Sequence, residues 1–142
     1  MMISTRALGT IVEYQCATAL MELGCVVSFP LGDFAKYDLI CDYHGHLLRL
    51  QVKHATATSD RITFHCESTQ INRTRVEFRR YTKDDIDYFC TFSFGKCYLV
   101  PVNECGTYKS LRLTPTRNNA SQGISWAADY EASVMLTKLI SV

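Results

Sequence analysis

Residues 37–53, YDLICDYHGHLLRLQVK, contain the pattern that decides the fold. Two apolar stretches flank a His-Gly dipeptide at 44–45, which is typical of a two-residue turn between antiparallel strands. The sequence therefore predicts a β-hairpin over these residues. With a turn of that length, Asp38 falls directly opposite Gln51, and the Cβ atoms of the two residues lie ~5 Å apart.

Side chains alternate between the two faces of a strand, which separates the second strand of this hairpin into an apolar and a polar set. The apolar set is Leu48, Leu50 and Val52, and the polar set is Arg49, Gln51 and Lys53. We therefore expect Asp38, Gln51 and Lys53 to share one face of the hairpin.

Upstream of the hairpin, apolar residues recur at helical spacing from residue 7 to residue 24. Thr5 is the predicted N-cap of this helix, and Gly24 suits its C-terminal end. Glu13 lies on the flank of the apolar stripe, near the boundary between the buried and the exposed face. We expect its carboxylate to point toward the edge of a sheet that packs against the helix.

The rest of the chain is predicted to form short strands, turns and a closing helix. No element is assigned to residues 72–80, which have no clear period. The sequence predicts a single α/β domain over residues 1–142, in which a mixed sheet is flanked by helices, with a core at about 5–102 and a C-terminal loop and helix at about 114–140. The remaining elements are strands at 25–29 and 61–66, a turn at 30–33, a helical turn at 83–86 capped by Thr82, a second hairpin at 88–92 and 96–102 that extends the same sheet, a polar loop at 114–125 and a helix at 127–139.

The composition excludes several classes of protein. With 47% hydrophobic and 20% charged residues in a chain of 142, it is that of a folded globular domain and not of a disordered chain or a coiled coil. Apolar runs end well before the ~18 residues of a membrane span, and the N-terminus lacks the apolar stretch of a signal peptide, so we expect a soluble cytoplasmic protein. The seven cysteines are odd in number and form no CxxC, which argues against a disulfide framework and a structural zinc site. The sequence contains no motif of P-loop enzymes, dinucleotide-binding domains or serine hydrolases.

Positive charge is concentrated in one quarter of the chain. The net charge is +1, but residues 49–83 contain eight basic and three acidic residues. Such a segment presents a phosphate-binding face without making the whole protein basic, although an ordinary solvated surface is the alternative. Tyr81 and Trp126 are expected to pack against other residues of the protein and not to stack on nucleic-acid bases. Because arginine binds phosphates and guanine edges, we predict DNA contacts at Arg73, Arg75, Arg79 and Arg80, with a second polar cluster at Arg117, Asn118, Asn119 and Gln122.

A helix with an acidic residue, a strand, and a hairpin with an Asp on one arm and a polar-x-Lys triplet on the other resemble the PD-(D/E)xK nuclease core. The residues that carry the resemblance are Glu13, Asp38, Gln51 and Lys53. Within this superfamily, the Gln, the YDLI context and the segment NNASQGISWAADYE at 118–131 are similar to QxK homing endonucleases encoded in bacterial group I introns. Two positions depart from the superfamily pattern, because Tyr37 replaces a Pro and Gln51 replaces an acidic residue.

The resemblance implies a restriction-endonuclease-like fold and hydrolysis of DNA phosphodiesters with Mg²⁺ or another divalent cation such as Mn²⁺. In that reading Asp38 is the central metal ligand, beside the side-chain oxygen of Gln51 and the backbone carbonyl of Val52. Glu13 holds a second ion or orients a water molecule. Lys53 orients the attacking water, helps to deprotonate it and offsets charge on the phosphoryl oxygens. Although the amide of Gln51 binds a cation less tightly than a carboxylate, two carboxylates suffice for Mg²⁺.

The implied substrate is double-stranded DNA, cut site-specifically in intron homing. Because one site cuts one strand, a double-strand break suggests a homodimer or a homotetramer. The expected location is the bacterial cytoplasm, with nucleoid association when bound to DNA. The alternatives are a Holliday-junction-resolvase-like nuclease, an RNA-cleaving enzyme, and a DNA-binding module whose site has decayed, with Gln51 as the mark of decay.

Overall fold

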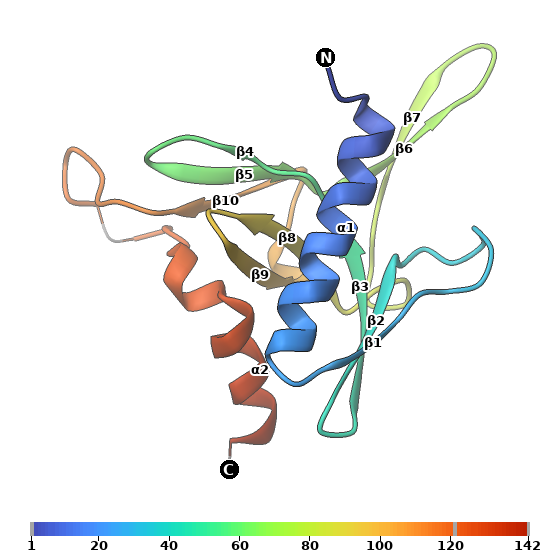
Figure 1. Ribbon diagram of the computed structural model, residues 1–142. Helices are drawn as coiled ribbons and strands as arrows, with labels where there is room; N and C mark the ends of the chain where they lie inside the picture. Colours follow the sequence, from blue (N-terminus) through green and yellow to red (C-terminus); the bar gives the residue numbers. More distant parts are fainter. Residues whose placement is uncertain (1, 121, 142) are drawn as a thin grey trace.

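The computed structural model describes residues 2–120 and 122–141, and over these residues it contains a central five-stranded mixed sheet in the order β1-β2-β3-β8-β9 (Figure 1). β3 and β8 run parallel, while the other neighbouring strands of this sheet are antiparallel. The strands are β1 (Val26–Ser28), β2 (Leu39–Tyr43), β3 (His46–Val52), β8 (Tyr88–Ser93) and β9 (Lys96–Pro101).

The predicted hairpin is present, with the predicted register. Leu39 pairs with Leu50 and Tyr43 with His46, which places Asp38, directly before β2, opposite Gln51. The turn residues His44 and Gly45 have φ values of 51° and 85°, the left-handed backbone that a tight two-residue hairpin turn requires.

The first helix, α1 (Thr5–Glu22), covers one face of the central sheet (Figure 1). Its buried stripe of Val12, Cys16, Ala17 and Leu20 packs against strand residues such as Leu39 and Leu50. The N-cap is Ser4 and not Thr5 as predicted: the backbone of Ser4 is extended, and its hydroxyl accepts a hydrogen bond from the Ala7 N–H at 3.1 Å.

A smaller sheet of β10-β5-β4 covers the opposite face of the central sheet. Its strands are β4 (Thr56–Ala57), β5 (Arg61–His65) and β10 (Tyr108–Arg112), and a 3-10 turn, η1 (Val102–Glu104), precedes β10. Ile62 and Phe64 of β5 pack on Phe89 and Val100 of the central sheet. The fold is therefore a mixed sheet with a helical layer on one face and a β layer on the other.

Residues 72–80, to which no element was assigned, belong to a two-stranded hairpin of β6 (Glu67–Ile71) and β7 (Val76–Arg80). The Asn72 side-chain oxygen closes its turn by accepting hydrogen bonds from the backbone N–H groups of Thr74 and Arg75. The hairpin projects from the body of the protein beyond the N-terminal half of α1 (Figure 1).

The predicted second hairpin is present as β8 and β9, and it extends the same sheet. The single closing helix predicted at 127–139 is wrong, because η2 (Ala127–Tyr130) and α2 (Ala132–Ile140) are separated at Glu131. The backbone of Glu131 forms a β-bridge with Tyr98, and its carboxylate pairs with Lys96. These contacts hold Glu131 at the sheet edge with ψ at 139°, outside the helical range.

Among the described residues, no helix has the length and apolar character needed to cross a membrane.

Candidate active site

Asp38 is held at the end of the β2–β3 hairpin by a backbone contact. Its Oδ2 atom accepts a hydrogen bond from the N–H of Val52 at 2.9 Å, while its own N–H donates to the carbonyl of Leu50 at 2.8 Å. The carboxylate is therefore fixed next to Gln51, on the face of the hairpin that the alternation of side chains predicts.

Lys53 extends from the end of β3 on the same face. Its backbone N–H donates to the carbonyl of Cys90 at 2.9 Å, which continues the ladder between β3 and β8. The ammonium group donates to the carbonyl of Glu67 at 3.1 Å and lies 5.4 Å from the centre of the Tyr81 ring. Burial lowers the pKa of Lys53, and the negative charge of Asp38 opposes that shift.

Glu13 reaches Asp38 from α1. Burial, the negative charge of Asp38 and a hydrogen bond between the two carboxyl groups together raise the pKa of Glu13 to about 7. Burial also raises the pKa of Asp38, although the N–H of Val52, the carboxyl group of Glu13 and the charge of Lys53 act in the opposite direction. The two acids thus lie together next to the N-terminal end of β2.

A pocket of about 410 Å³ opens at this point. Asp38 and Gln51 form part of its wall, and the base of the β6–β7 hairpin forms another part. The hairpin side of the wall comprises Ser68, Gln70, Arg79, Arg80 and the adjacent Tyr81, and the rest comes from Asp33, Phe34, Ala35, Lys36 and Asp85. The structure therefore brings two of the predicted DNA-binding arginines to the pocket that Asp38 and Gln51 line, whereas Glu13 and Lys53 are not lining residues of it.

The donor atoms in this region suit a hard divalent cation. Glu13 and Asp38 offer carboxylate oxygens, and Gln51 offers an amide oxygen, all of which Mg²⁺ and Mn²⁺ accept. Burial raises the pKa of both acids, and the charge of Asp38 raises that of Glu13 further. A divalent cation between them would offset their mutual repulsion, so the residues present fit such an ion.

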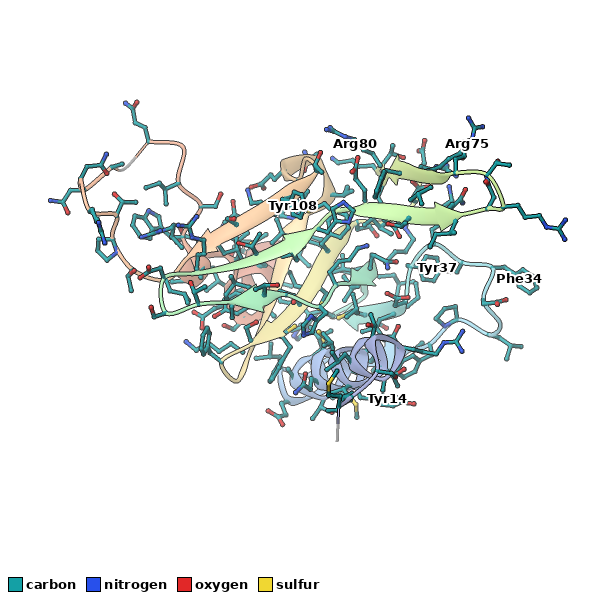
Figure 2. The ribbon with its side chains drawn as sticks, turned by 90° about the horizontal axis from the view of Figure 1, so that it is seen from above. Tyr14, Phe34, Tyr37, Arg75, Arg80 and Tyr108 are labelled. Carbon is teal, nitrogen blue, oxygen red and sulfur yellow. The ribbon has the colours of Figure 1, made fainter. Side chains whose placement is uncertain are left out.

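The predicted DNA-binding residues of the β6–β7 hairpin are exposed, and two of them have acidic neighbours. Arg75 pairs with Glu77 at 2.8 Å, and Arg80 lies 3.8 Å from a carboxylate oxygen of Glu67. Figure 2 shows Arg75 and Arg80 on the same hairpin, with Phe34 and Tyr37 on the segment beside it. Arg73 is in the turn of the hairpin and Arg79 is in β7 beside the pocket.

The second predicted cluster lies elsewhere. Arg117, Asn118, Asn119 and Gln122 belong to the loop between β10 and η2, on the opposite side of the molecule from the β6–β7 hairpin (Figures 1 and 2). The structure does not bring these four residues to the pocket.

Arg49 shows why a count of basic residues is insufficient. It belongs to the basic segment, but its guanidinium binds Asp87 and the backbone carbonyls of Lys83 and Asp84. The backbone N–H of Arg49 also donates to the carboxylate of Asp87 at 2.8 Å. Arg49 therefore holds residues 83–87, the segment that leads into β8, whereas Arg79 and Arg80 line the pocket.

Sequence reasoning missed two groups around Lys53, the carbonyl of Glu67 and the ring of Tyr81. Both come from the ends of the β6–β7 hairpin, which the irregular pattern of residues 72–80 did not reveal. The stretch 67–71, ESTQI, directly before it, was the available signal, since a strand there followed by Asn72 predicts a turn.

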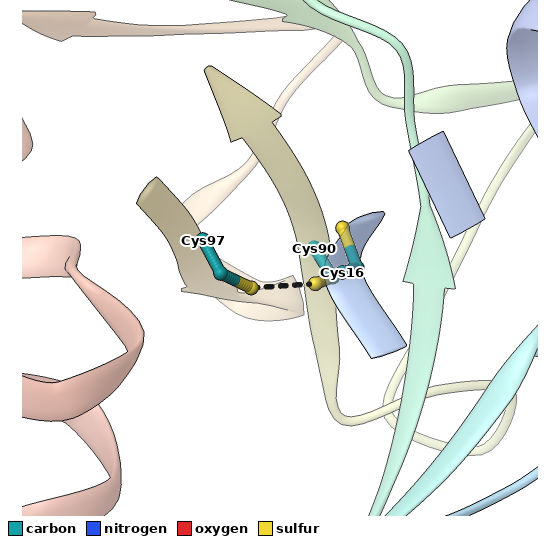
Figure 3. Close-up of side chains that lie close together, drawn as sticks. All are labelled: Cys16, Cys90 and Cys97. Carbon is teal, nitrogen blue, oxygen red and sulfur yellow. Dashed lines mark hydrogen bonds between the residues drawn. The ribbon is translucent and has the colours of Figure 1, made fainter. Parts of the chain in front are cut away.

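Three buried cysteines also lie together, between α1 and the central sheet (Figure 3). The sulfur atoms of Cys16, Cys90 and Cys97 are within 4.8 Å of one another, and those of Cys90 and Cys97 are 3.3 Å apart. Two thiolates on one tetrahedral zinc lie ~3.8 Å apart, given Zn–S bonds of ~2.3 Å. Within the part of the chain that the structure describes, the group offers three thiol ligands, whereas a structural zinc site uses four. Sulfur is also a soft ligand and does not suit Mg²⁺. We therefore interpret these thiols as part of the core.

Comparisons with known proteins identify a family and a similar fold for the chain. A sequence model of the family described as PD-(D/E)XK endonuclease matches residues 3–133. The fold is similar to the solved structure of a bacterial homing endonuclease, I-Ssp6803I, with a TM-score of 0.76 and 25% sequence identity. That similarity covers 96% of this chain and 95% of the other. No curated protein matched the chain.

Proposed function

Since this chain belongs to the PD-(D/E)XK endonuclease family, we propose that it hydrolyses phosphodiester bonds of double-stranded DNA with the help of Mg²⁺ or Mn²⁺. The observation that carries the proposal is the convergence of Glu13, Asp38, Gln51 and Lys53 from α1 and the β2–β3 hairpin. We take residues 1–142 as one nuclease domain.

Asp38, Gln51, Glu13 and the backbone carbonyl of Val52 are the proposed cation ligands. Asp38 has the central place because its carboxylate lies between the hairpin and α1. When bound, the cation supplies Lewis acidity and lowers the pKa of a water molecule at the scissile phosphate. Gln51 contributes no charge, so Glu13 and Asp38 provide the two negative charges of the ligand set.

Lys53 is the proposed group that contacts the reacting phosphate. Its ammonium has three donors, of which one is directed at the carbonyl of Glu67. We propose that the other two orient the attacking water and offset negative charge on the phosphoryl oxygens. Removal of a group of this kind typically lowers the rate by ~10²–10³.

The arginines of the β6–β7 hairpin are proposed to bind the DNA backbone next to the site. Arg79 and Arg80 line the same pocket as Asp38, so a phosphate bound by them lies beside the reacting one. Arg73 and Arg75 continue this contact along the hairpin. Arg117, Asn118, Asn119 and Gln122 are proposed to contact DNA at a separate place, or across another copy of the chain.

Site-specific cleavage in intron homing is the finer proposal. It is supported by the similarity to a bacterial homing endonuclease over nearly the full length of both chains. One pocket cuts one strand, so a double-strand break needs at least two copies, and we propose a homodimer or a homotetramer. A bacterial cytoplasmic location follows from this role.

Nicking of supercoiled plasmid with and without Mg²⁺ or Mn²⁺ tests the proposal. Wild-type protein is compared with Asp38→Ala and Lys53→Ala on plasmids with and without a candidate target site. Lys138→Ala, in the last turn of α2, is the matched control. We expect metal-dependent nicking followed by linear product for wild type and the control, and a rate lower by ~10²–10³ for the two site variants.

Other outcomes of this assay distinguish the alternatives. DNA binding without metal-dependent cleavage would indicate a binding module, and cleavage confined to four-way junctions would indicate a resolvase-like enzyme. Equal nicking by wild type and Asp38→Ala would contradict the proposed site.

A further inference from the structure

We propose that Tyr81 is a positioning residue for Lys53, and that through it the β6–β7 hairpin controls where the lysine ammonium lies. This inference rests on the proposed function, because it assigns to Tyr81 a role in the reaction that Lys53 assists. It goes beyond that function by linking the DNA-binding arm of the protein to the reacting centre.

The two groups that contact the Lys53 ammonium come from opposite strands of one hairpin. The carbonyl oxygen of Glu67, 3.1 Å from Nζ, belongs to the first residue of β6. Tyr81, whose ring centre is 5.4 Å from Nζ, directly follows the last residue of β7. Glu67 pairs with Arg80 in the hairpin ladder, so both contacts are made at its base.

Tyr81 is itself fixed in place. Its ring meets the ring of Phe89 edge-on, with 5.5 Å between the centres and 89° between the planes. Phe89 is only 1% exposed and pairs with Gln51 across β3 and β8. Tyr81 and Ser68 of β6 line the same pocket. The ring is therefore anchored to the central sheet through Phe89.

The fixed ring of Tyr81 restricts where the Lys53 ammonium can lie. The side chain of Lys53 has a flexible four-carbon stem, and its ammonium is attracted to the negative face of an aromatic ring. Contact with Tyr81 restricts the rotamers of Lys53 to those that keep Nζ near the pocket containing Asp38 and Gln51. The same ring also shields one side of the ammonium from water.

The hairpin that supplies these contacts also carries the proposed DNA-binding arginines. Arg79 and Arg80 immediately precede Tyr81, and all three line one pocket. A phosphate bound by the two arginines restrains the chain segment that ends in Tyr81. Binding of the DNA backbone and placement of the Lys53 ammonium are thus coupled through the C-terminal end of β7.

Substitution of the ring tests this role in the reaction. Tyr81→Leu and Tyr81→Met remove the aromatic face and keep much of the volume, while Tyr81→Phe keeps the face and removes only the hydroxyl. We expect kcat for nicking to fall roughly ten-fold in the Leu and Met variants, with KM for DNA unchanged. Tyr81→Phe is expected to keep the wild-type kcat, and Lys138→Ala in α2 is the control.

A second measurement needs no activity and no DNA. In the NMR spectrum of the full chain, the ε-methylene protons of Lys53, assigned by their loss in Lys53→Arg, should show an upfield ring-current shift. The shift should persist in Tyr81→Phe and disappear in Tyr81→Leu and Tyr81→Met, with circular dichroism confirming that the variants are folded. If wild type fails to cut any DNA, the proposed function fails while this contact is still tested.

The result that supports the inference is loss of both the shift and kcat in the Leu and Met variants with retention of both in Tyr81→Phe. It is overturned if the Lys53 signal is the same in wild type and Tyr81→Leu. It is also overturned if kcat is unchanged in Tyr81→Leu, or if the substitutions change only KM.

Discussion

The carboxylate of Asp38 accepts a hydrogen bond from the backbone N–H of Val52 at 2.9 Å, across the β2–β3 hairpin. The contact fixes one carboxylate oxygen to the strand that carries Gln51 and Lys53. Because the donor is a backbone group, this contact follows from the register of the hairpin. The other carboxylate oxygen is the one that we propose binds the cation.

Replacement of Asp38 by Asn separates the structural role of this residue from its role in the reaction. An amide oxygen can still accept the N–H of Val52, so we expect the thermal unfolding temperature to stay close to that of wild type. The negative charge is lost, and the nicking rate should fall by ~10²–10³. Plasmid nicking and thermal unfolding measure the two effects, with the exposed Asp129→Asn as control. A loss of activity that is explained by unfolding would contradict this assignment.

Gln51→Glu should increase the affinity of the site for Mg²⁺. The substitution adds a third carboxylate beside Glu13 and Asp38, and carboxylates bind hard cations more tightly than amides. The Mg²⁺ concentration for half-maximal nicking is expected to decrease, and Gln51→Leu should increase it. Titration of the nicking rate with Mg²⁺ measures this change. Equal requirements in wild type and both variants would remove Gln51 from the ligand set.

Arg79→Ala combined with Arg80→Ala should reduce the salt dependence of DNA binding. Each phosphate contact contributes ~0.9 to the slope of log affinity against log salt concentration, so the slope should decrease by about two units. Fluorescence anisotropy at several salt concentrations provides the slopes. Lys138→Ala in α2 serves as the control, and an unchanged slope in the double variant would place these arginines outside the interface.

The pairing of Asp87 with Arg49 predicts the pH dependence of stability. Burial acts to raise the pKa of Asp87, but the hydrogen bonds and the charge of Arg49 outweigh it, so the pKa lies below its ordinary value. A depressed pKa stabilises the folded state above the unfolded value of ~3.9, and this stability is lost as the pH falls through the folded pKa.

Asp87→Asn should therefore destabilise the protein at pH 7 by roughly 1 kcal/mol, a value reduced for the partial exposure of the pair. The difference from wild type should shrink as the pH falls below about 4. Urea unfolding at pH 7 and pH 3 measures it. A difference that is the same at both pH values would show that the ionised carboxylate is not responsible.

Much of the site follows from local sequence rules. The two-residue turn at 44–45 fixes the register of the hairpin, and the register fixes that Asp38 and Gln51 are opposite each other. Alternation along β3 then places Lys53 on the same face. These rules depend only on backbone geometry, so they apply to a strand residue whatever its side chain.

The environment of Lys53 did not follow from such rules. The contacts of its ammonium with Glu67 and Tyr81 depend on a separate hairpin whose strands have mostly polar, exposed residues and hence no apolar alternation. The break at Glu131 in the predicted closing helix was missed for a related reason. Glu131 is drawn out of the helix by pairing with Tyr98 on β9, a contact between residues far apart in the sequence.

The location of a bound divalent cation is the most direct test of the account. Crystals of the protein soaked with Mn²⁺ would reveal it by anomalous scattering. We predict a peak within ~2.0–2.3 Å of oxygen atoms of Asp38 and Gln51, on the side that faces Glu13 and Lys53, and its loss in Asp38→Asn. A cation bound elsewhere in a protein that still cuts DNA, or a peak that is unchanged in Asp38→Asn, would contradict the proposed site.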